Sequence, residues 1–129
     1  MIDHMGIAVR DLGASRRFYD AALGALDMKV NMEATPDQTE SGGTALGYGA
    51  GDEKIFWIAD NERPGEGTHV AFKVERRDQV DAFHAAGLKA GGRDNGAPGL
   101  RPHYGPNYCA AFLLDPDGAN IEAVCYADR

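Results

Sequence analysis

The chain has 129 residues and a formal net charge of −7, with 43% hydrophobic and 26% charged residues. This length suits one globular domain, and the negative charge argues against nucleic acid and anionic membranes as partners, because both are bound by clusters of Lys and Arg. The sequence has no apolar run of the roughly 18 residues that a membrane span requires, and its opening MIDHMGIAV lacks the basic head of a signal peptide. We therefore expect a cytoplasmic protein.

The first half of the chain predicts a strand, a helix and three further strands. Apolar residues alternate over residues 5–9, which is the pattern of a β-strand. LGASRRFYDAALGAL then places apolar side chains at helical spacing, and Gly24 is a suitable helix end. Strand-like runs follow at residues 25–32, 43–50 and 53–59. Residues 1–60 are therefore expected to form a β-α-β-β-β module.

The second half repeats the first. With a shift of 65 residues, DHMGIAVRDLGASRRFYDAAL aligns without a gap on THVAFKVERRDQVDAFHAAGL, so that His4 meets His69. Gly87 is the predicted end of the second helix, and the Gly- and Pro-rich residues 87–106 are predicted to be a long loop. A DPDG turn at residues 115–118 should separate the last two strands. We expect one domain, residues 1–129, with residues 61–67 linking module one to a second module over residues 68–129.

Strand alternation assigns the side chains to two faces. One face carries large apolar residues that should pack under the helices: Met5, Ile7, Val9, Val70, Phe72 and Val74. The opposite face carries His4 and His69 beside small residues, which suggests a cavity. Aligning the last strands of the two halves matches Phe56 to Glu122, and folding the final hairpin sets Glu122 opposite Phe112. A carboxylate in such an apolar strand is costly unless it is paired, protonated or bound to metal.

Two histidines and a carboxylate from three strands match the ligands of a divalent transition metal with open positions for substrate. The alternative is that His4 and His69 are isolated histidines at strand edges and that Glu122 is solvated. Because His4 and His69 occupy equivalent positions in the repeat, we favour a site that both of them share.

Other candidates for ligand binding are aromatic or polar. In the predicted loop, Arg101, His103, Tyr104 and Tyr108 are expected to approach a ligand, with an anionic or carbonyl group favoured by the arginine; the alternative is a solvated surface loop. Phe56 and Trp57 are candidates for stacking on a ligand, although packing in the core explains them equally well.

The motifs DHMGIAVRDLGASRRFYDAALGAL, THVAFKV and DPDGANIEAV span nearly the whole chain and resemble the vicinal oxygen chelate superfamily, which includes glyoxalase I, bleomycin resistance proteins and extradiol dioxygenases. The resemblance implies an α+β fold of two βαβββ modules, with curved mixed sheets around a metal site, helices on the outer face, and a homodimer. His4, His69 and Glu122 fall on metal-ligand positions. The fourth ligand position of glyoxalase I falls on Phe56 or, after a shift of one residue, on Trp57.

Three functions are consistent with this resemblance. The first is a glyoxalase-like lyase or isomerase, in which iron, manganese, nickel or zinc polarises a carbonyl or enediolate substrate and Glu122 ligates the metal or moves the proton. The second is an extradiol-type dioxygenase with iron at His4, His69 and Glu122. The third is a drug- or metabolite-binding protein without metal and without catalysis. Phe56 at the fourth position favours the third, and the three ligand-type residues favour an enzyme; we favour the first.

Overall fold

The computed structural model describes all 129 residues and contains two βαβββ modules, as predicted. Module one consists of β1 (Met5–Ala8), α1 (Leu12–Gly24), β2 (Lys29–Ala34), a short 3-10 helix η1 (Pro36–Gln38), β3 (Ala45–Gly49) and β4 (Phe56–Ala59). Module two consists of β5 (His69–Val74), α2 (Arg77–Lys89), β6 (Arg93–Leu100), β7 (Cys109–Leu114) and β8 (Asn120–Cys125). Neither long helix has the length and apolar character needed to cross a membrane.

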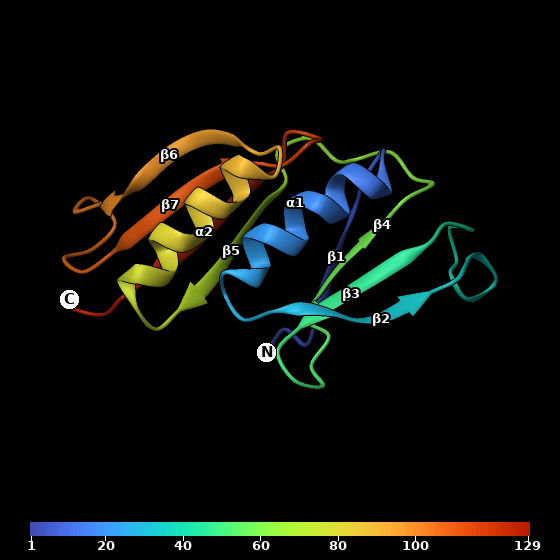
Figure 1. Ribbon diagram of the computed structural model, residues 1–129, viewed down its shortest axis with the longest axis horizontal. Coiled ribbons are helices and arrows are strands. Elements are labelled where there is room, and N and C mark those ends of the chain that lie inside the picture. Colours follow the sequence, from blue (N-terminus) through green and yellow to red (C-terminus); the bar gives the residue numbers. More distant parts are fainter.

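Each module forms one mixed sheet of four strands. The strand orders are β1-β4-β3-β2 and β5-β8-β7-β6, with one parallel pair in each sheet, β1 with β4 and β5 with β8. Both helices lie side by side over the same face of the two sheets (Figure 1). A single core of 23 buried residues extends through both modules. The opposite face of each sheet is left without a helix, and we call it the open face.

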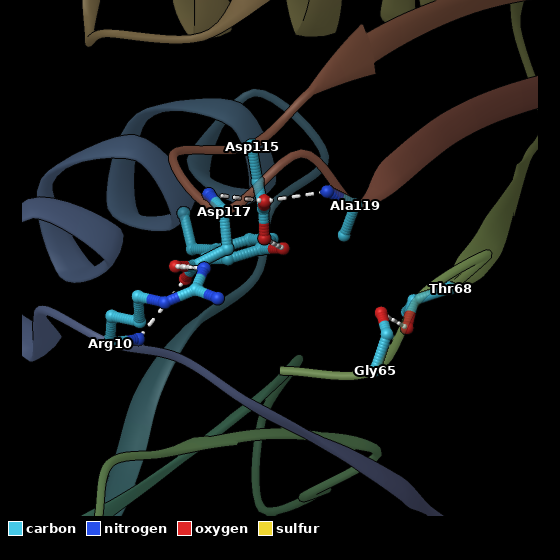
Figure 2. A network of polar contacts seen from close by, with 7 residues as sticks. Arg10, Gly65, Thr68, Asp115, Asp117 and Ala119 are labelled. Atoms are coloured by element: carbon cyan, nitrogen blue, oxygen red, sulfur yellow. Dashed lines mark hydrogen bonds and ion pairs between the residues drawn. The ribbon is translucent and has the colours of Figure 1, made fainter. Parts of the chain in front are cut away.

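The two modules are tied together by the DPDG turn between β7 and β8. The buried carboxylate of Asp115 accepts hydrogen bonds from the Tyr19 hydroxyl of α1 at 2.6 Å and from the backbone N–H groups of Asp117 and Ala119, both at 2.9 Å. Arg10, which follows β1, donates its backbone N–H and its guanidinium to the carboxylate of Asp117 at 3.2 and 3.3 Å (Figure 2). The turn therefore joins residues about 100 positions apart.

Helix α2 does not end at Gly87, as the sequence pattern predicts, but continues to Lys89. Gly87 instead allows α2 to approach β7 closely. A Cβ atom at this position would lie 2.3 Å from Cδ1 of Leu113 and 3.2 Å from Cε1 of Phe18. Close packing thus explains the glycine in α2, whereas Gly24 is the last residue of α1, as predicted.

Gly87→Ala should destabilise the protein by about 1–3 kcal/mol, because the new methyl group overlaps Leu113 in a closely packed core. The matched control is Gly24→Ala, where nothing lies within 4 Å of the new Cβ. That change should leave stability unchanged or raise it by up to about 1 kcal/mol, because alanine favours the helix. Urea unfolding of both variants measures the difference, and equal stabilities would contradict the packing role of Gly87.

The segment predicted as a long loop contains an edge strand instead. Residues Arg93–Leu100 form β6, which pairs with β7 through two shifts of register, one on each side of Gly96. Glycine and proline disfavour regular strands but are tolerated at edges and bulges, which is why the composition of this strand resembles that of a loop. Within the predicted loop, the irregular parts are the turn at residues 90–92 and residues 101–106.

The alternation predicts the buried side chains of β5 correctly, but in β1 Ile7 is only partly buried and Met5 is exposed. In β5, Val70, Phe72 and Val74 are buried, and the residues between them are exposed. In β1, Met5 is 36% exposed, although it shares a face with core residues, because it begins an edge strand.

Candidate functional site

A row of paired residues crosses the open face of module two. Gly96 on β6 pairs with Phe112 on β7, Phe112 pairs with Glu122 on β8, and Glu122 pairs with Ala71 on β5. The predicted pairing of Glu122 with Phe112 is therefore confirmed. Because β8 is an inner strand, Glu122 lies at the middle of the sheet, and it is only 1% exposed.

Both oxygens of Glu122 have partners. Nε2 of His69 lies 2.9 Å from Oε1, and the Tyr108 hydroxyl donates a hydrogen bond to Oε2. Burial, the hydrogen bond to Glu122 and the charge of that carboxylate raise the pKa of Tyr108 well above its usual value. Tyr108 therefore keeps its proton and remains a donor near neutral pH. The His69 side chain is 48% exposed, so a ligand can reach the imidazole although Glu122 itself is buried.

Several aromatic rings lie close to the two partners of this carboxylate. The ring centroids of Tyr104 and Tyr108 are 5.2 Å apart, and those of Tyr108 and Tyr126 are 5.4 Å apart. The ring of Phe112 lies 6.4 Å from the imidazole of His69. Tyr126 was not identified as a site residue from the sequence. Strand alternation could have found it, because residues 122, 124 and 126 point to the same face of the sheet. His69 and Glu122 therefore lie in an aromatic part of the open face.

The remaining loop candidates lie together at the β6 side of the same face. Arg101, His103 and Tyr104 line a hollow of about 310 Å³ with Phe112. The guanidinium carbon of Arg101 lies 5.5 Å from the centre of the Phe112 ring. The rings of His103 and Tyr104 are 4.1 Å apart.

His4 lies in the other module, immediately before β1. Its Nδ1 is 2.7 Å from the carboxylate of Asp3, and its side chain is 58% exposed. Within one chain, no group of three or more His, Cys, Asp or Glu side chains is arranged to hold a metal ion. The structure thus brings His69 together with Glu122 but leaves His4 apart from them.

The corresponding row in module one corrects an alignment made from the sequence. Gly6 pairs with Trp57, as Ala71 pairs with Glu122, so Trp57 rather than Phe56 is the counterpart of Glu122. The indole of Trp57 lies against Gly47, where a Cβ would be 2.9 Å from two of its ring carbons.

Phe56 lies on the opposite face of the sheet from Trp57. It is 1% exposed, and its ring lies 5.2 Å from that of Tyr19 and 5.3 Å from that of Phe72. Core packing, rather than an open-face site, therefore accounts for Phe56. Because side chains alternate in a strand, an alignment that is wrong by one residue moves a residue to the wrong face.

The donors on the open face of module two fit a divalent metal in kind. An imidazole nitrogen and a buried carboxylate are ligands that transition metals prefer, and Tyr108 supplies the hydrogen bond that orients such a carboxylate. Two donors do not complete a site. A third would come from His4, which is exposed and has only Asp3 as a partner.

Comparisons with known proteins agree with this architecture. The model of the Glyoxalase/Bleomycin resistance protein/Dioxygenase superfamily matches residues 1–123. A glyoxalase/bleomycin resistance protein from Albidiferax ferrireducens has a similar structure, with a TM-score of 0.76, 31% sequence identity, and coverage of 97% of this chain and 98% of that chain. A comparison with curated proteins finds no match.

A second solved structure with a similar fold is that of glyoxalase I from Zea mays. The TM-score is 0.72 at 25% identity, and the similarity covers 96% of this chain but only 45% of the maize protein. A glyoxalase/bleomycin resistance protein/dioxygenase family enzyme from Burkholderia phytofirmans has the same fold, at 18% identity and a TM-score of 0.68. The match of the family model over nearly the whole chain, together with the two-module fold, shows that this chain belongs to the glyoxalase/bleomycin resistance protein/dioxygenase superfamily.

Proposed function

We propose that the chain is a small-molecule enzyme of the glyoxalase-like lyase or isomerase kind, with Glu122 at its centre. The observation that carries this proposal is a buried carboxylate on an open sheet face, held by His69 at one oxygen and by Tyr108 at the other. Both partners lie in the same module as Glu122, so this carboxylate takes no part in the network that joins the two modules. It is well placed to accept a proton from a bound substrate.

His69 and Glu122 would hold a divalent metal, with His4 as the third ligand. When bound, such a metal would polarise a carbonyl or enediolate oxygen of the substrate. Tyr108 orients Glu122 by its hydrogen bond to Oε2, which leaves Oε1 directed toward His69. Glu122 is only 1% exposed, so few water molecules reach its carboxylate.

We further propose that the protein is a homodimer in which His4 of one chain completes the site of the other. Two observations support this assembly. His4 is not grouped with His69 and Glu122 within one chain, and each chain has two open sheet faces that no helix covers. In a two-fold dimer, each chain would offer module one to one site and module two to the other.

A non-catalytic binding protein is the second candidate, and Trp57 is the observation that favours it. Trp57 stands where the repeat places the counterpart of Glu122, so the position of a fourth metal ligand holds an indole. An indole on an open face offers a surface for stacking on a flat ligand. In this case His69 and Glu122 would contact the ligand directly.

Elemental analysis of untagged, chelator-free protein separates the two candidates. We expect close to one equivalent of a divalent metal per chain, lost in His69→Ala and in Glu122→Ala. His103→Ala is the matched control, because this histidine lies outside the proposed donors, and it should retain the metal. Wild-type protein that contains no metal and binds none on addition would remove the metalloenzyme proposal and leave the binding protein.

A further inference from the structure

The hollow beside Phe112 has no carboxylate in its lining, although the chain carries 20 acidic residues. Its lining consists of Arg101, His103 and Tyr104, which follow β6, and of four strand residues: Asn95, Gly96, Phe112 and Asn120. A lining that holds an arginine and a histidine but no carboxylate favours a negatively charged occupant. The hollow's volume of about 310 Å³ limits that occupant to a small molecule or to one part of a larger one.

Arg101 is held in place before any ligand arrives. Its two terminal nitrogens donate to the carbonyl oxygens of Gly99 at 2.8 Å and Ala97 at 2.7 Å, while the guanidinium lies over the ring of Phe112. It forms no ion pair. The guanidinium has five N–H groups, so donors remain for a ligand. An arginine fixed in this way loses little conformational entropy when it binds an anion.

Gly96 makes this arrangement possible. Its φ of +151° lies in a region that side chains rarely adopt, and a Cβ there would be 2.9 Å from Cδ1 of Phe112 and 3.2 Å from Nη2 of Arg101. The bulged edge strand therefore leaves the space into which Arg101 and Phe112 fit. Two amides also line the hollow, and the Asn95 side chain donates to Oδ1 of Asn120 at 3.2 Å.

The hollow lies next to His69 and Glu122 on the sheet. Two of its lining residues are their cross-strand partners, Phe112 for Glu122 and Asn120 for His69. A small ligand could therefore place one end in the hollow and the other at the carboxylate.

We propose that this hollow binds the anionic group of the substrate, so that the substrate is a small carboxylate- or phosphate-bearing molecule whose reacting end lies at Glu122 and His69. Arg101 binds the anion through its guanidinium, and the amides of Asn95 and Asn120 contribute hydrogen bonds. This inference rests on the proposed function for the identity of the reacting end, but binding in the hollow is measurable without metal and without turnover.

Benzoate and benzamide are matched probes, because they have nearly the same shape and differ in charge. In NMR titrations of the metal-free full chain, benzoate should shift the amide signals of Gly96, Asn95 and Asn120, and benzamide should not. Arg101→Met should weaken the binding of benzoate by about 10- to 100-fold, as expected for a hydrogen bond to a charged group. Phenyl phosphate, tested in parallel, shows which of the two anions binds more tightly.

Arg101→Lys serves as the second variant, in case Arg101→Met disturbs the turn after β6. It keeps the charge but loses the planar fork, and its affinity for benzoate should fall between those of the other two proteins. Equal binding of benzoate and benzamide, shifts confined to other parts of the chain, or unchanged affinity in a folded Arg101→Met variant would overturn the inference. If benzoate binds as expected but the protein takes up no metal, the hollow stands and the metalloenzyme proposal fails.

Discussion

Asp115→Ala should lower the free energy of unfolding by about 3 kcal/mol or more, because it leaves three donors without their acceptor. The Tyr19 hydroxyl loses its partner in a fully buried position, and the backbone N–H groups of Asp117 and Ala119 lose the contacts that shape the turn. Few other single side chains join both modules in this way. Urea unfolding followed by circular dichroism measures the loss.

Two further variants separate the contributions to this network. Tyr19→Phe removes one of the three hydrogen bonds and should cost about 1–2 kcal/mol, part of it from leaving the carboxylate with fewer donors. Arg10→Ala removes an ion pair to Asp117 whose arginine side chain is 66% exposed, and it should cost less than about 1 kcal/mol. A loss below 1 kcal/mol in Asp115→Ala would mean that water replaces the carboxylate and that the turn does not hold the modules together.

This hydrogen-bond network explains the structural role of the DPDG motif, which from the sequence alone was only a turn signal and a sign of the family. In DPDG, the first Asp accepts hydrogen bonds from the backbone and from α1, the second binds Arg10, and the glycine adopts a φ of +88°. The motif thus has a structural role near the site. Its presence supports the fold and the family, and it carries no information about the reaction.

The features predicted well from the sequence are those that depend on repetition and on local pattern. The gapless alignment of two halves predicted two equal modules, and the alternation in β5 predicted which side chains are buried. The hairpin around the DPDG turn placed Glu122 opposite Phe112, because a short turn determines the register of the strands it joins.

The features that were missed depend on the register between strands that are distant in the sequence. Phe56 and Trp57 are neighbours on one strand, and only the pairing of β4 with β1 shows which of them faces the site. Likewise, the strand character of β6 comes from its pairing with β7, since its own sequence of Gly, Pro and Asn predicts a loop. The contact between Tyr108 and Glu122 required the folded hairpin.

Mixing two variants that have each lost metal binding should restore part of it if each metal site is formed by residues of both chains. His4→Ala damages module one, and Glu122→Ala damages module two. In a dimer with one chain of each kind, one site has both changes and the other has none. After unfolding and refolding an equal mixture, random pairing should place one intact site in half of the dimers, which is about one quarter of all sites.

The matched control is a mixture of His69→Ala and Glu122→Ala chains. Both changes lie in module two, so every site in the mixed dimer keeps one damaged donor, and no metal binding should return. Equilibrium dialysis with cobalt or zinc reports the fraction of restored sites, and sedimentation confirms that dimers have formed. If dimers form and both mixtures remain metal-free, His4 does not complete the site of a second chain. If only the first mixture regains metal binding, each site is formed by both chains of the dimer. This would explain why His4 is not grouped with His69 and Glu122 within one chain.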